Sequence, residues 1–157
     1  MLSTLPFLMA YCTLTFLLVR KDLEEGLLPD KYLCPLLWSG LLYQLICQPA
    51  FLPSAVTGAM AGYVGFACLY WSYWLIYKTE GLGYGDVKYF AALGAWHGWK
   101  ALPAIALSAA LLATVYIVIQ MLRFPDLEVQ KNPLPFGPFL AVAGLLNGGL
   151  SLFSFPL

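Results

Sequence analysis

Charged side chains are scarce in this sequence: they make up 10% of the 157 residues, whereas 61% are hydrophobic. Soluble domains carry about 25% charged residues, so this chain has too few polar groups to cover a water-soluble globule. The composition excludes a soluble enzyme and a disordered linker. The basic and acidic residues number eight each, which argues against nucleic acid as a partner. We therefore expect an integral membrane protein surrounded by lipid.

Paired metal ligands are missing as well. The four cysteines (Cys12, Cys34, Cys47 and Cys68) lie in apolar runs without CxxC spacing, and His97 is the only histidine. Structural zinc sites need four converging ligands, which paired cysteines usually supply. We expect no metal and no cofactor, and we interpret the cysteines as small packing residues.

The apolar residues fall into six segments, which cover residues 2–19, 32–51, 54–77, 87–99, 101–122 and 133–155. Five of them approach or exceed the roughly 20 residues that cross a bilayer. The fourth would be only about 20 Å long, so it begins below the membrane surface or takes residues from the preceding loop. The first lacks a basic start and a cleavage site, so we interpret it as a retained helix. The sequence predicts an all-α polytopic membrane protein with about six transmembrane helices in a single domain, residues 1–157.

Local signals refine these segments. Asp30 is a candidate N-cap for the second helix, and small residues such as Gly58 and Gly62 suit close helix contact in the third. With six alternating crossings, seven of the eight basic residues fall on one side and only Lys100 on the other. The positive-inside rule makes the crowded side cytoplasmic. All eight acids share that side, so we expect any ionisable chemistry there.

Two of these acids are candidates for chemistry. Asp22 follows the first apolar segment, and Asp86 follows Gly81, Gly83 and Gly85 at the start of the short fourth helix. An acid on a helix that begins below the membrane surface is costly to ionise. A second acid nearby would make the two carboxyls share one proton, and such a pair suits activation of water for attack on an amide. The glycines allow positive φ and close approach of another chain. Alternatively, Asp86 is only an N-cap and Asp22 a solvated charge.

The other ionisable groups have simpler interpretations. We expect solvated loop charges at Glu24, Glu25, Glu80, Asp126 and Glu128. His97 is expected as an interfacial side chain at the outer end of the fourth helix. Lys88 either pairs with an acid or extends to the membrane surface.

Three blocks of sequence carry a resemblance to a known family. Gly83-Tyr84-Gly85-Asp86-Val87-Lys88 resembles the GxGD motif of type IV prepilin peptidases. Asp22, followed by Leu28-Pro29-Asp30, resembles the block around the family's first aspartate. Leu134-Pro135-Phe136-Gly137-Pro138-Phe139 resembles its Pro-Phe-Gly-Pro-Phe segment. Together the blocks span residues 22–141.

The resemblance implies the GxGD aspartic protease fold and an intramembrane aspartic endopeptidase with Asp22 and Asp86 as its catalytic pair. It implies an active-site loop with Gly83, Tyr84, Gly85 and Lys88, and substrate docking at Pro135, Phe136, Gly137 and Pro138. The implied substrates are type IV prepilins or type II secretion pseudopilins. They would lose a short basic leader at the cytoplasmic face of the bacterial inner membrane.

One feature departs from the longer family members, which carry a double CxxC zinc region associated with N-methylation. This sequence has no CxxC and begins one helix before Asp22, similar in extent to the preflagellin peptidases. We therefore expect cleavage without methyl transfer. Alternatives are a preflagellin-type peptidase, a proton-coupled transporter subunit and an inactive paralogue. In a transporter we would expect acids at several depths of the membrane, whereas all eight acids here are expected on one side.

Overall fold

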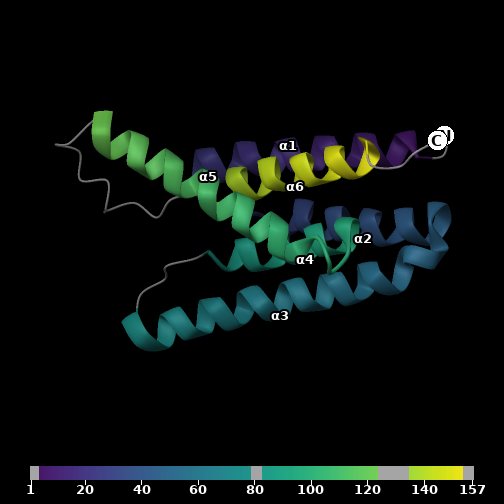
Figure 1. The fold of residues 1–157 in the computed structure, drawn as a ribbon, viewed down its shortest axis with the longest axis horizontal. Helices are drawn as coiled ribbons and strands as arrows, with labels where there is room; N and C mark the ends of the chain where they lie inside the picture. The colour runs from purple at the N-terminus through teal and green to yellow at the C-terminus, as the bar shows by residue number, and fades with distance from the viewer. Residues whose placement is uncertain (1–3, 79–82, 124–134, 154–157) are drawn as a thin grey trace.

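The computed structural model describes residues 4–78, 83–123 and 135–153, which form a bundle of α-helices without strands (Figure 1). The elements are α1 (Leu5–Glu25), α2 (Asp30–Cys47), the 3-10 turn η1 (Pro49–Phe51), α3 (Leu52–Tyr77), α4 (Tyr84–His97), α5 (Leu102–Arg123) and α6 (Gly137–Phe153). The all-α membrane fold expected from composition is confirmed. Two stretches, Pro49–Tyr77 and Leu102–Arg123, are long and apolar enough to cross a membrane by length and composition.

The first helix continues beyond its apolar segment. It ends at Glu25 rather than Val19, because ion pairs one turn apart join Arg20 to Glu24 at 2.7 Å and Lys21 to Glu25 at 2.5 Å. Gly26 then ends the helix in the left-handed conformation, with φ of 64°. This extension places Asp22 on a rigid helix instead of in the loop that follows.

The start of α2 corrects one expectation. Pro29 occupies the N-cap position and Asp30 is the first helical residue, without a side-chain cap. Both carboxylate oxygens of Asp30 instead accept hydrogen bonds from Lys88 Nζ at 2.8 Å. The prediction of Asp30 as the N-cap was wrong because a charged donor on another helix binds the carboxylate, and such bonds are stronger than bonds to neutral groups.

Helix α4 is short because it lies inside the bundle. Ten of its fourteen residues are buried, and it packs along α3 as Figure 1 shows. A Cβ on Gly58 would lie 2.5 Å from the Gly94 carbonyl oxygen, and one on Gly62 would lie 3.0 Å from that of Phe90. The small residues of α3 therefore let the two backbones meet, as their spacing predicted.

The first turn of α4 lies well before the end of α3. The hydroxyls of Tyr84 and Tyr63 share a hydrogen bond, and the Tyr84 ring contacts that of Tyr70. Helix α3 continues to Tyr77, about 10 Å farther at 1.5 Å per residue. Helix α4 thus takes residues 84–86 from the preceding loop and still begins deep beside α3.

Candidate active site

The two candidate carboxyls share one cavity, although Asp22 belongs to α1 and Asp86 to α4. This cavity, of about 320 Å³, is lined by both aspartates and by Gly26, Leu27, Leu28, Gly83, Tyr84, Gly85, Pro135 and Phe136. The side chains of Asp22 and Asp86 are nevertheless only 5% and 6% exposed. Folding therefore brings the three sequence blocks together around a pair of buried acids.

The Pro-Phe-Gly-Pro segment holds Asp22 directly. The backbone N–H of Gly137 donates a hydrogen bond to Asp22 Oδ2 at 3.0 Å. A Cβ at position 137 would lie 2.6 Å from the same oxygen, so only glycine permits this approach. Pro135 and Phe136 line the cavity, whereas Pro138 is not among its lining residues. The backbone N–H of Gly137 therefore binds Asp22 of the same chain.

Asp86 lies in the first turn of α4. Its backbone N–H bonds to the Gly83 carbonyl at 3.0 Å, and Gly83 is the N-cap residue with φ of −68°. The expected positive φ is therefore wrong for Gly83. It is also wrong for Gly85, which has the negative φ of a helical residue. Gly81 lies outside the described residues. Close approach does hold at Gly85, where a Cβ would lie 2.8 Å from Leu28 Cβ. The loop between α1 and α2 consequently lies against the GxGD turn.

Burial dominates the electrostatics of the pair, which lies outside the apolar segments. It raises the pKa of Asp86 to about 7, with a further contribution from the charge of Asp22. Burial also raises the pKa of Asp22, and the Gly137 N–H opposes that rise by stabilising the carboxylate. The pair therefore exchanges a proton near neutral pH, in a titration that belongs to both acids together.

Another predicted site residue, Lys88, lies outside the cavity, and the acids expected as loop charges can be compared with the structure. Lys88 bonds to Asp30 rather than to either buried acid, and it lines a separate pocket of about 220 Å³ with Leu33 and Trp38. Its role is to join α4 to α2. Glu24 and Glu25 are exposed as expected, but on α1 and in ion pairs. The remaining predicted loop charges, at Glu80, Asp126 and Glu128, lie outside the described residues.

Leu27 and Leu28, which sequence reasoning did not single out as site residues, also line the cavity. The sequence feature that could have indicated this position is the Leu-Pro-Asp block, whose leucine is Leu28. A leucine beside an acid supplies no chemistry of its own, so only the fold reveals that it closes the site.

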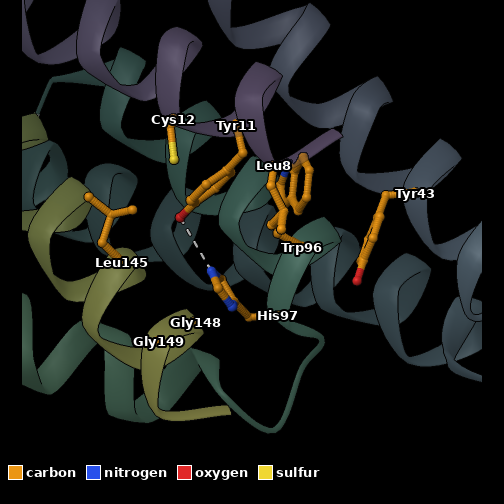
Figure 2. Close-up of a pocket in the computed structure, with 9 residues that line it drawn as sticks. All are labelled: Leu8, Tyr11, Cys12, Tyr43, Trp96, His97, Leu145, Gly148 and Gly149. Carbon is orange, nitrogen blue, oxygen red and sulfur yellow. Dashed lines mark hydrogen bonds between the residues drawn. The ribbon is translucent and has the colours of Figure 1, made fainter. Parts of the chain in front are cut away.

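A third pocket lies at the other end of α4. It measures about 310 Å³, and Figure 2 shows Tyr11 of α1 pointing toward His97 across it. Their hydroxyl oxygen and Nε2 are 3.4 Å apart. His97 is half-buried at the end of α4, and no group of three metal-ligating side chains occurs in the described part of the chain.

A helical bundle with an apolar exterior and two buried carboxyls in one cavity has the features of a membrane-embedded hydrolase. The family model for type IV leader peptidases matches residues 9–118, and the chain belongs to this family. It is therefore a membrane peptidase, as its motifs predicted. No solved structure matches the chain.

Individual relatives agree with this assignment. The chain is 54% identical to Leader peptidase HopD of Salmonella typhimurium over 148 residues, which is 94% of this chain and 95% of the relative. It is 51% identical to Leader peptidase HopD of Escherichia coli over 152 residues, 97% of each protein. It is 46% identical over 140 residues to Prepilin leader peptidase/N-methyltransferase of Aeromonas salmonicida, covering 87% of this chain but 47% of that relative.

Proposed function

We propose that this peptidase uses Asp22 and Asp86 as a catalytic pair to remove the short basic leader from type IV prepilins or type II secretion pseudopilins. The observation that carries the proposal is the burial of both carboxyls in one cavity, from helices separated in sequence. The names of the relatives support leaders and prepilins as the class of substrate.

The two acids would divide the work of peptide hydrolysis. Asp86 holds the shared proton, because burial and the charge of Asp22 both disfavour its ionisation. Asp22 carries the negative charge, which the Gly137 N–H stabilises. Asp22 then takes a proton from water, whose oxygen attacks the scissile carbonyl carbon, while Asp86 donates a hydrogen bond to the carbonyl oxygen. The C–N bond breaks when Asp22 passes that proton to the leaving nitrogen.

The cavity also suggests how a substrate is held. Pro135 and Phe136, which precede α6 without regular secondary structure, line the cavity together with Leu27 and Leu28. An irregular segment of this kind is tolerated at membrane depth where it lines a cavity. We place the substrate beside it, with the scissile bond facing the two acids.

The proposed setting is the cytoplasmic face of the bacterial inner membrane, crossed several times by this chain. Seven of the eight basic residues fall on the side that holds Asp22 and Asp86 in the six-crossing arrangement. A basic leader that remains in the cytoplasm would meet the site from this side.

The decisive experiment is co-expression with a panel of prepilins, followed by detection of leader loss on a gel. Asp22→Asn and Asp86→Asn each keep the size of the side chain but remove the carboxyl that exchanges the proton, so cleavage should fall at least about a thousandfold. Glu24→Gln is the matched control, because Glu24 is an exposed carboxyl two positions from Asp22 on the same helix. Near-normal cleavage by either Asn variant, at equal membrane abundance, would refute the assignment.

A further inference from the structure

The inward face of α1 is polar. Its buried residues are Tyr11, Thr15, Leu18 and Asp22, whose spacing of four, three and four places them along one side of the helix. Three of the four carry a hydroxyl or a carboxyl. Polar groups turned inward from a membrane helix are costly and generally serve function. Asp22 lines the cavity, and the Tyr11 hydroxyl contacts His97. The burial of the Thr15 hydroxyl has no such explanation.

Helix α4 presents a second buried hydroxyl opposite this face. Tyr89 follows Asp86 by three positions, so the two share one side of α4, and Tyr89 is completely buried. Its hydroxyl has no hydrogen-bond partner among the described residues, and the same holds for Thr15 Oγ1 and Asp86 Oδ1. Buried polar atoms without partners are rare in native proteins and call for an explanation.

These atoms belong to one environment. The Thr15 hydroxyl lies beside that of Tyr89, without a hydrogen bond of good geometry between them. Thr15 is two turns before Asp22 on α1, and Tyr89 is one turn after Asp86 on α4. Tyr11 is the remaining titratable neighbour. Within the described ranges, α2, α3, α5 and α6 place no further titratable group against Tyr89. Along both helices the hydroxyl pair therefore lies on one side of the acids, and the cavity-lining residues 26–28 and 83–85 lie on the other.

We propose that Tyr89 is a positioning residue for the aspartate pair: its hydroxyl, with Thr15 beside it, stabilises the negative charge that the pair carries while water is activated. The proposal rests on the proposed function of Asp22 and Asp86. A fixed dipole in a site closed to bulk water acts strongly on nearby charge and needs no reorganisation during the reaction. Tyr89 does not line the cavity, so it acts through the acids and not on the substrate.

The test compares Tyr89→Phe with Tyr11→Phe in the purified full-length chain, using a prepilin with a basic leader as substrate. Both variants remove one hydroxyl from a buried ring. Tyr11, however, points toward His97 (Figure 2) and lies about 17 Å from Asp22 along α1. We expect Tyr89→Phe to lower kcat about tenfold with KM unchanged, and Tyr11→Phe to leave both unchanged. Thr15→Val, which keeps the side-chain shape, should give a smaller loss of kcat.

The pH profile supplies a readout that a purely structural role would not move. Loss of a dipole that stabilises negative charge raises the pKa at which the pair ionises. The acidic limb of the kcat profile should therefore move upward by about half a pH unit in Tyr89→Phe and stay in place in Tyr11→Phe.

Thermal unfolding in detergent distinguishes an electrostatic role of Tyr89 from a packing role. Because the Tyr89 hydroxyl makes no hydrogen bond of good geometry within the described residues, its removal should leave Tm unchanged or raise it. An unchanged kcat and pH profile in Tyr89→Phe would overturn the proposal while leaving Asp22 and Asp86 as the catalytic pair. A fall in kcat accompanied by a fall in Tm would also overturn it, since that result indicates a packing role. Full activity of Asp22→Asn would instead refute the proposed function itself.

Discussion

A methyl group on Gly137 would lie 2.6 Å from Asp22 Oδ2, closer than real Cβ contacts allow. The atom in its way is the end of a side chain, so Gly137→Ala should displace the Asp22 carboxylate and leave the helices in place. A displacement of about 1 Å at a reacting group lowers rates about a hundredfold, and we expect a loss of cleavage of that size. Gly149→Ala is the control, because a Cβ there meets nothing within 4 Å. Equal cleavage by the two variants would contradict the contact.

The titration of Asp86 predicts how stability depends on pH. Burial raises its pKa from 3.8 to about 7 in the folded protein. Between these values the unfolded chain is ionised and the folded chain is protonated, so folding takes up a proton. The contribution of Asp86 is therefore fully present below pH 3.8 and is lost as the pH rises through about 7. Asp86→Asn, which is neutral throughout, should unfold at a higher temperature than the wild type at pH 8. The difference should shrink at pH 5, and parallel Tm curves would contradict the burial of an ionisable Asp86.

At the residue scale, the sequence predicted which acids to examine but not what surrounds them. Asp22 and Asp86 were identified by a resemblance over three motifs, and the structure places them in one cavity. The bond between Lys88 and Asp30 and the burial of Tyr89 depend on which faces of α1, α2 and α4 meet. No spacing within a single helix determines that orientation when nearly every residue is apolar.

Close packing between α3 and α4 determines where the GxGD turn lies. A Cβ on Gly58 would lie 2.5 Å from the Gly94 carbonyl oxygen, whereas one on Gly65 meets nothing within 4 Å. Gly58→Leu should therefore force the helices apart and lower the free energy of unfolding by about 1–3 kcal/mol. Gly65→Leu should be tolerated. Thermal unfolding of both variants in detergent tests this prediction, and equal stability would show that the backbones do not meet as described.

At the element scale, the apolar segments predicted the helices better than their ends. Helix α1 runs past its apolar segment because ion pairs on its surface continue the helical pattern to Glu25. Helix α4 starts earlier than its apolar segment because Tyr84 packs against the side of α3. Hydropathy reports contact with lipid or with other helices, whereas helix ends depend on local bonds that it does not record.

The arrangement of the whole molecule in the membrane follows from charge and can be tested separately. Arg20, Lys21, Lys31 and Lys88 belong to the same end of the bundle as the aspartate pair, whereas Lys100 follows the opposite end of α4. We expect a reporter fused after Glu25 to be cytoplasmic and one fused near Leu52 to be external. A cytoplasmic signal near Leu52 would contradict the six-crossing arrangement and the proposed position of the site.

The last prediction concerns a reaction that this chain should not perform. It covers 47% of the length of the Aeromonas salmonicida relative whose name includes N-methyltransferase. The zinc region associated with methylation in longer family members needs four converging ligands. Here the cysteines at 12, 34, 47 and 68 are 22, 13 and 21 positions apart, so no CxxC unit can form from them. We therefore expect this protein to cleave its substrate without methylating it.

Mass spectrometry of a pilin processed by this protein alone provides the measurement. In cells lacking any other prepilin peptidase, the new first residue should carry a free α-amine. The matched comparison is the same pilin processed by the Aeromonas salmonicida protein, whose name includes both activities. A mass increase of about 14 Da, one methyl group, in the first sample would mean that the helical core suffices for methyl transfer.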